Sequence, residues 1–185
     1  MDSKVLLQIV HKAIEEEFGG KKIDKEGYYL LYPALKEKRA VFVTINKRDS
    51  LRGCIGSLIA YRPLLEDLIE NAKSAAFKDP RFPPLSKEEY ESGDLEIEIS
   101  ILTPPKELNY SDIDDLKAKI KPNVHGVILT IQNYRATFLP QVWEQLPTFD
   151  AFFAHLCQKA GLTPDCLKYH PKIEVYEAIK IKEEK

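Results

Sequence analysis

The stretch Leu95-Glu-Ile-Glu-Ile-Ser-Ile101 alternates apolar and polar residues more cleanly than any other part of the chain. Successive side chains of a β-strand point to opposite faces, so this period of two predicts a strand with one buried face and one polar face. The polar face carries Glu96, Glu98 and Ser100, and Pro104-Pro105 ends the strand because proline cannot donate to a β-ladder. Such a strand is typical of an antiparallel sheet.

The segments on either side of this strand mix helical and extended patterns. Apolar residues at helical spacing predict helices at residues 3–18, 63–77, 86–91, 111–120, 140–146 and 149–160. Runs rich in β-formers predict strands at residues 41–45, 51–59, 124–131, 134–139 and 173–181. The order lacks βαβ regularity, so the predicted class is α+β with a largely antiparallel sheet and packed helices.

Composition sets limits on the function. The chain has 185 residues, which suits one domain with room for a smaller lobe. Its 44% hydrophobic and 30% charged residues are typical of a folded protein, and a chain of this length is expected to fold without a metal or a disulfide. The net charge of −2 argues against a surface that binds nucleic acid or anionic membrane as a whole, although a local basic patch stays open.

The three cysteines are Cys54, Cys157 and Cys166. None belongs to a Cys-x-x-Cys pair, and the histidines show no ligand spacing with them, so we expect no disulfide framework and no metal site. This usage favours a reducing, cytoplasmic location. The first residues lack the apolar core of a signal peptide, and no apolar run approaches the ~20 residues of a membrane span. No phosphate loop or dinucleotide motif is present, so no cofactor is expected.

The segment Leu51-Arg-Gly-Cys-Ile-Gly-Ser57 is the densest candidate for a functional site. In an extended chain Arg52, Cys54 and Gly56 share one face. Gly53 and Gly56 weaken a strand, which indicates close approach of another backbone or of a ligand. A guanidinium beside a thiol favours the thiolate in general. The alternative is that Cys54 is a small buried side chain that lets strands pack closely.

Two further residues are candidates for chemistry. Glu98 joins Arg52 and Cys54 in one cleft if their strands share a sheet, but it also suits the solvated face of an antiparallel strand. His125 precedes a predicted strand and is the candidate base for Cys54 in a thiol–imidazole pair. It equally suits a hydrogen-bonding role at the strand end, because nothing in the spacing shows that His125 and Cys54 meet.

The loop Asp79-Pro-Arg-Phe-Pro-Pro84 contains three prolines and is expected to be stiff. We favour an ion pair between Asp79 and Arg81 that locks this loop, while a substrate-binding role for both residues stays open. Trp143 is expected to anchor a core or the junction of two lobes, and His11 is expected on the charged surface of the first helix.

Together these motifs resemble a known family over residues 5–180. Leu51-Arg-Gly-Cys-Ile-Gly56 is similar to the hallmark hexapeptide of the AMMECR domain family. Other segments resemble that family in the same order: residues 41–44, 79–84, 98–100, 125–126, 138–142 and 156–162. Residues 135–140 and 142–146 resemble its prokaryotic branch, protein A of the AmmeMemoRadiSam system.

The resemblance implies one AMMECR-type domain over residues 1–185, folded in two unequal lobes with the hexapeptide near their junction. It implies no particular reaction, and it implies a Memo-like protein and a radical SAM protein as partners. We therefore expect a cytoplasmic accessory or binding protein that does not bind membranes. The residues expected to hold a small molecule or a peptide are Arg52, Gly53, Gly56, Asp79, Arg81 and Glu98.

Two alternatives stay open from the sequence. One is a thiol-dependent enzyme with Cys54 as nucleophile and His125 as base. The other is a nucleic-acid-associated factor, which the near-neutral charge disfavours.

Overall fold

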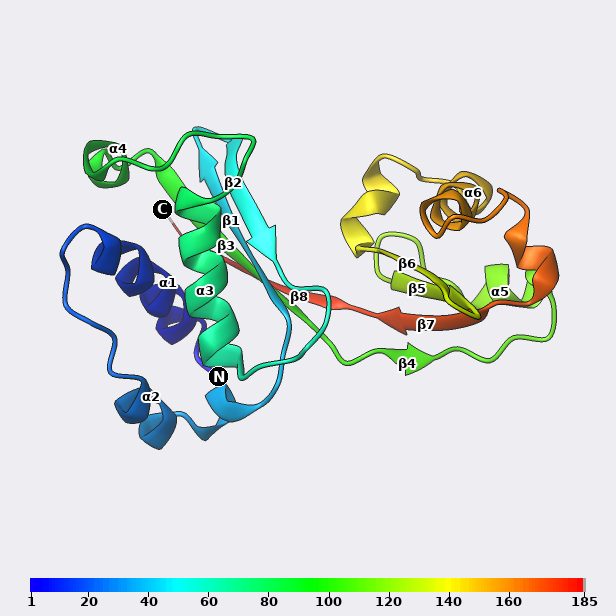
Figure 1. Cartoon of the computed structure of the whole chain (residues 1–185), viewed down its shortest axis with the longest axis horizontal. Helices are drawn as coiled ribbons and strands as arrows, with labels where there is room; N and C mark the ends of the chain where they lie inside the picture. The colour runs from blue at the N-terminus through cyan, green and yellow to red at the C-terminus, as the bar shows by residue number, and fades with distance from the viewer. Residues whose placement is uncertain (185) are drawn as a thin grey trace. The chain divides into compact units, whose positions relative to one another are not determined.

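The chain forms two compact units in this computed structural model, which describes residues 1–184 (Figure 1). Unit 1 contains residues 1–102 together with residues from 179 onward, and unit 2 contains residues 103–178. Unit 2 is therefore an insertion in the sequence of unit 1, and the chain passes from one unit to the other twice. Each unit has its own sheet and its own core.

Unit 1 is built on a four-stranded sheet with the strand order β2-β1-β3-β8. Strand β1 is antiparallel to both β2 and β3, and the predicted hairpin β1–β2 turns at Arg48 and Asp49, which both have positive φ. Its elements are α1 (Ser3–Glu17), α2 (Lys25–Leu31), η1 (Pro33–Lys36), β1 (Val41–Lys47), β2 (Ser50–Gly56), α3 (Leu64–Phe77), α4 (Lys87–Glu91), β3 (Leu95–Leu102) and β8 (Ala178–Lys182).

Helices α1 and α3 cover one face of this sheet (Figure 1). Alternate residues of β1 and β3 point into the core between sheet and helices, and Val43, Ile45, Ile97 and Ile99 are almost fully buried there. The amphipathic pattern of residues 3–18 predicted α1 to within one residue at its end. Its N-cap is Asp2, whose carboxylate accepts a hydrogen bond from the Lys4 N–H.

Unit 2 is built on a second four-stranded sheet with the order β4-β7-β5-β6, in which β7 is antiparallel to β4 and β5. Its core is rich in aromatic rings. Trp143 is fully buried, stacks on Phe152 with 3.7 Å between ring centroids, and donates to the His125 carbonyl. The elements are β4 (Lys106–Glu107), α5 (Ile113–Lys119), β5 (Gly126–Ile131), β6 (Tyr134–Phe138), η2 (Pro140–Glu144), α6 (Phe149–Lys159), η3 (Cys166–Tyr169) and β7 (Lys172–Tyr176).

The predicted class is confirmed, but two predicted elements need correction. The single strand predicted over residues 173–181 is two strands, β7 and β8, which belong to different sheets. Between them, Glu177 exchanges hydrogen bonds with Thr103, where its N–H donates to the hydroxyl and its carbonyl accepts the Thr103 N–H. The segment predicted as a helix over residues 140–146 is the 3-10 turn η2. Among the described residues, no helix is both long and apolar enough to cross a membrane.

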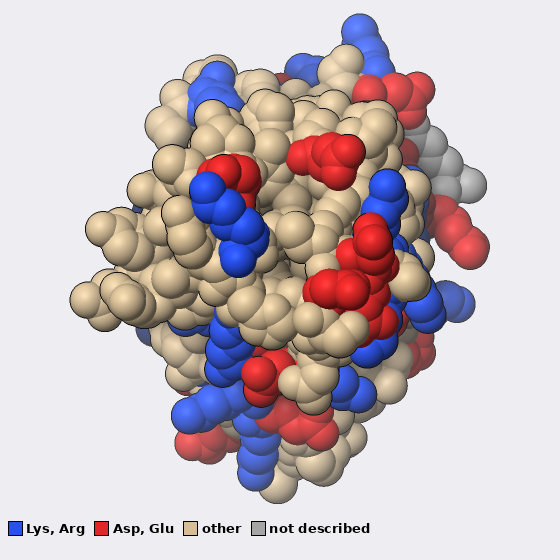
Figure 2. Space-filling view, turned by 90° about the vertical axis from the view of Figure 1, so that its right-hand side faces the viewer, with Lys and Arg blue, Asp and Glu red and all other residues tan. Residues whose placement is uncertain are grey.

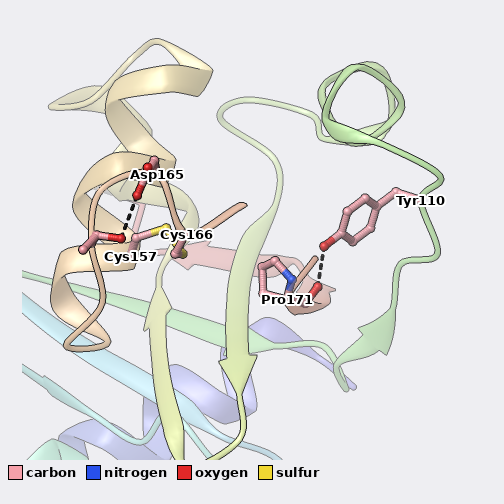
Figure 3. The surroundings of a disulfide bond; sticks show 6 residues. Tyr110, Cys157, Asp165, Cys166 and Pro171 are labelled. Atoms are coloured by element: carbon pink, nitrogen blue, oxygen red, sulfur yellow. Dashed lines mark hydrogen bonds between the residues drawn. A yellow bond between two sulfur atoms is a disulfide. The ribbon is translucent and has the colours of Figure 1, made fainter. Parts of the chain in front are cut away.

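The cysteines require a larger correction, because Cys157 and Cys166 form a disulfide (Figure 3). The expectation that the chain has no disulfide is therefore wrong for these two residues. Gly161, with φ +88°, ends α6 and lets the chain reverse, so that η3 brings Cys166 back to Cys157 with 5.8 Å between their Cα atoms. Motif spacing did not reveal this pair because its geometry depends on that reversal.

Candidate functional site

Strand β2 carries the hexapeptide at residues 51–56, and a β-bulge interrupts it. Gly53 lies opposite Ile45, but Leu51 lies opposite Asn46, so Arg52 has no partner on β1. A bulge places an extra residue in one strand and re-aims its side chain. The simple alternation that placed Arg52 and Cys54 on one face therefore does not hold at this position.

The Arg52 guanidinium is engaged within unit 1. Arg52 is 9% exposed, and it donates from Nε and Nη2 to the two carboxylate oxygens of Glu89, each at 3.0 Å. Its Nη2 also donates to the Pro83 carbonyl at 2.8 Å, and Lys47 donates to Glu89 at 2.8 Å. The hydrogen bond from Arg52, with the charge of Lys47, lowers the pKa of Glu89 to about 2. The ligand-binding role predicted for Arg52 would have to compete with this ion pair.

The two glycines of the hexapeptide allow close packing. A Cβ atom added to Gly53 would lie 2.2 Å from the backbone carbonyl oxygen of Ala75 on α3. A Cβ added to Gly56 would lie 2.2 Å from the ring of Phe42 on β1. Of the two reasons predicted for glycine here, the approach of another backbone accounts for Gly53.

Asp79 and Arg81 form the predicted ion pair across Pro80. The buried Asp79 carboxylate accepts from Arg81 Nε at 3.0 Å and Nη2 at 2.8 Å, and from the Cys54 N–H at 3.0 Å. Arg81 Nη2 also donates to the Cys54 carbonyl at 3.3 Å. The hydrogen bonds from Arg81, with that from the Cys54 N–H, hold the pKa of Asp79 far below its ordinary range.

This pair also protects an exposed sheet edge. Strand β2 is the outer strand, so its outward backbone groups would otherwise be available to a further strand. Asp79 accepts from the Cys54 N–H, and Arg81 donates to the Cys54 carbonyl, as a neighbouring strand would do. The loop at residues 79–84 therefore closes the edge of the sheet beside Cys54.

Cys54 lies in a row of polar side chains that crosses three strands. Thr44 on β1 is opposite Cys54 on β2 and also opposite Glu98 on β3. Residues directly opposite one another on antiparallel strands share a face, with Cβ atoms about 5 Å apart. Cys54 forms no disulfide, and its thiol is 3.2 Å from the Thr44 hydroxyl. Cys54, Thr44 and Glu98 are all half-buried. Val43 and Ile45 point to the helices, so this row lies on the opposite face.

Thr44 was missed in the sequence analysis. The signal was present, because residues 41–45 form a β-rich run in which Thr44 is the polar member between buried neighbours. What the sequence does not give is the register that places Thr44 between Cys54 and Glu98. We call Cys54, Thr44 and Glu98 the polar row.

His125 lies in unit 2, at the end of the loop that precedes β5. Its Nδ1 accepts a hydrogen bond from the Lys121 N–H at 3.1 Å, and partial burial lowers the pKa of its imidazole. His125 thus forms a hydrogen bond next to the start of a strand, which is one of the two roles predicted for it from the sequence. A thiol–imidazole pair between His125 and Cys54 of unit 1 stays a prediction.

Two buried polar residues on α3 were also missed. Asp67 accepts from the Val41 N–H at 2.8 Å, from the Ser57 hydroxyl at 2.7 Å and from Arg62 Nε at 2.7 Å. Asn71, one turn later, donates to the Val41 carbonyl and to Ser57. They fix the start of β1 and the chain just after β2, and so support the hexapeptide from the side of the helix.

The surface charges are mixed. Figure 2 shows Lys and Arg side chains interspersed with Asp and Glu on one face of the molecule. A surface that attracts nucleic acid by charge needs a basic field, and this face does not present one in the described chain. Within residues 1–184, no group of three or more His, Cys, Asp or Glu is placed to hold a metal ion.

Comparison with known proteins gives one consistent family. The AMMECR1 family profile matches residues 7–181, which include parts of both units. A protein of Methanothermobacter thermautotrophicus is 38% identical over 185 residues, covering 95% of this chain and 90% of that protein. A protein of Methanocaldococcus jannaschii is 42% identical over 159 residues, covering 82% and 75%. The crystal structure of an uncharacterised protein from Pyrococcus horikoshii has a TM-score of 0.76 at 36% identity, covering 97% of this chain and 90% of that one.

Proposed function

The chain belongs to the AMMECR1 family, and from this premise we propose that it is a binding protein whose ligand contacts the polar row. The observation that carries the proposal is the register that aligns Cys54, Thr44 and Glu98 on three adjacent strands. A half-buried group on a strand is held in place by the sheet and still meets solvent. The row thus offers a thiol, a hydroxyl and a carboxylate in fixed positions.

Arg81 supplies the cationic end of this surface. Its side chain is 54% exposed, whereas the guanidinium of Arg52 is buried against Glu89. Asp79 holds the Arg81 guanidinium through Nε and Nη2 beside the Cys54 carbonyl, so a carboxylate or a phosphate would meet its remaining Nη1 edge. In this proposal Arg52 and Gly53 hold β2 against α4 and α3, and Gly56 makes room for the ring of Phe42 on β1.

The ligand is a small molecule or a side chain of a partner peptide. Addition of a peptide strand to β2 at Cys54 is disfavoured, because Asp79 and Arg81 already satisfy the N–H and the carbonyl that such a strand would use. Contact with the face of the sheet leaves those hydrogen bonds intact. We therefore expect the side chains on the face of the sheet to recognise the ligand, without addition of a strand to β2.

The partners we propose are a Memo-like protein and a radical SAM protein. Support comes from the resemblance of residues 135–140 and 142–146 to the prokaryotic branch of the family. We also propose that both units form one AMMECR-type domain and that the protein is cytoplasmic. The disulfide removes the cysteine argument for that location, so cell fractionation is its direct test.

Co-purification with the Memo-like and radical SAM proteins of the same genome tests the proposal. We expect one of them to associate, and Arg81→Ala combined with Glu98→Gln to weaken the association roughly tenfold or more through loss of charged hydrogen bonds. Glu174→Gln is the matched control, a half-buried strand carboxylate in unit 2. If neither protein associates with the wild-type chain, the proposed partners are wrong. If the double variant associates as well as the wild-type chain, the polar row is not the binding surface.

A further inference from the structure

A second polar cluster in unit 1 lies outside the proposed site, around His11 of α1. His11 was predicted at the surface from the sequence, but its side chain is half-buried between two other elements. Its Nδ1 is 2.7 Å from the hydroxyl of Tyr90 on α4, and its Nε2 pairs with the carboxylate of Glu183, just after β8. Tyr90 in turn donates to Glu15 on α1 at 2.9 Å.

The hydrogen bonds determine the charge of His11. The single hydroxyl proton of Tyr90 goes to Glu15, because a carboxylate only accepts, so the Tyr90 oxygen must accept from Nδ1. The Glu183 carboxylate likewise only accepts, so Nε2 must donate. Both ring nitrogens of His11 therefore carry protons, and the network as it stands requires an imidazolium ion.

Glu183 holds the end of β8 on the sheet. Its second carboxylate oxygen accepts the Ile97 N–H at 2.9 Å, and its own N–H donates to the Ile97 carbonyl at 3.0 Å. Strand β8 is also the segment through which the chain returns from unit 2. The contact between His11 and Glu183 thus fastens the C-terminal end of the strand by which the chain returns from unit 2.

We propose that His11, Tyr90 and Glu183 form a pH-sensitive latch that fastens β8 to unit 1 while His11 is protonated and loosens it when His11 loses its proton. Neutral imidazole has only one N–H, so if it still donates to Glu183, its bare Nδ1 can only accept from Tyr90. Tyr90 then loses its hydrogen bond to Glu15, and the contact with Glu183 changes from an ion pair to a weaker neutral hydrogen bond. The groups that face His11 are Glu15 on its own helix, Tyr90 on α4 and Glu183 after β8.

The pH range of the latch follows from the signs of the pKa shifts. The hydrogen bond to Glu183 raises the pKa of His11 above its ordinary 6.5, against the effect of burial. Burial alone would raise the pKa of Glu183, but His11 and the Ile97 N–H lower it below 4.5 overall. The raised pKa of His11 means that its contribution to stability is complete below pH 6.5 and is lost as the pH rises through the raised value. The lowered pKa of Glu183 means that its contribution is complete above pH 4.5 and is lost at lower pH. The latch is therefore closed in mildly acidic solution and opens toward alkaline pH.

Hydrogen exchange of the full chain between pH 5.5 and pH 9 tests this inference. After correction for the intrinsic pH dependence of exchange, we expect the amides of residues 179–183 to lose protection roughly tenfold as His11 deprotonates. In His11→Gln these amides should be poorly protected at every pH. His155→Gln, at an exposed histidine of α6, should keep the wild-type step.

Tyr90→Phe covers the case in which His11→Gln does not fold. It removes the acceptor of Nδ1 but keeps the pair with Glu183, so the step in protection should move to lower pH. An NMR titration of the His11 ring gives the same midpoint independently. Protection of β8 that does not change with pH in the wild-type chain, or a step that persists in His11→Gln or stays in place in Tyr90→Phe, overturns the latch.

Discussion

The two units are stabilised by different means. The core of unit 1 is mainly aliphatic, and the described buried polar and charged residues all belong to unit 1: Arg52, Asp67, Asn71, Asp79 and Ser100. Unit 2 has a core rich in aromatic rings, in which Trp143 stacks on Phe152, and it is cross-linked by the disulfide. Burying a charge is unfavourable unless it is paired and hydrogen-bonded, so a unit that buries several must hold each partner in position.

Two of the buried charges of unit 1 lie at the candidate site. Arg52 is part of β2, and Asp79 accepts from the backbone of β2. The groups that are most expensive to bury are therefore gathered around the hexapeptide. Unit 2, the smaller unit, packs its described core without such charges, so the buried charges follow the position of the hexapeptide and are not a general feature of both cores.

The largest expected effect is that of Asp79→Ala in unit 1. The change leaves the Cys54 N–H without its acceptor and Arg81 without its partner, so we expect the free energy of unfolding to fall by about 3 kcal/mol. Denaturation followed by far-UV circular dichroism measures the loss. Trp143 is the single tryptophan and lies in unit 2, so its fluorescence shows whether unit 2 is affected.

Asp165→Ala is the control for this change. Asp165 also pairs with a nearby cation, Lys168, but both side chains are well exposed, so little effect on stability is expected. Equal losses from the two substitutions would show that the buried charges of unit 1 are no more important than surface pairs.

Removal of the disulfide should weaken unit 2 in particular. Cys157→Ala with Cys166→Ala, or reduction of the wild-type chain, releases a short loop and should lower the free energy of unfolding by about 2.5 kcal/mol. The fluorescence transition of Trp143 should move, while hydrogen exchange in β1 and β3 should not. Cys54→Ala serves as the control in unit 1, and a uniform loss across both units would contradict independent stabilisation.

Acid should have a smaller effect, located in unit 1. Because the pKa of Glu89 is lowered from 4.5 to about 2, its ion pair stabilises fully above pH 4.5 and is lost as pH falls toward 2. Between pH 7 and pH 4 we expect a loss of about 1 kcal/mol from this group. The difference between the wild-type chain and Glu89→Gln, measured at several pH values, isolates it from His11, which titrates in the opposite direction. A difference that is independent of pH would remove the Arg52–Glu89 pair as the cause.

The sequence by itself determined those features that depend on neighbouring residues. The alternation at residues 95–101 predicted β3, helical spacing predicted α1, α3 and α6, and the loop with three prolines predicted the pair Asp79–Arg81. In each case the pattern lies within one element or one tight loop. Local geometry then follows from backbone sterics and from the period of each structure.

The tertiary structure decided whatever depends on residues that are distant in the chain. Register placed Thr44 between Cys54 and Glu98, a bulge in β2 directed the Arg52 guanidinium to Glu89, and Glu183 engaged His11 in a hydrogen-bond network. The disulfide and the division of residues 172–182 between two sheets belong to the same group. Such contacts form only when packing and loop closure bring residues together that are distant in the chain. The local periodicity of the sequence does not indicate which distant residues will meet.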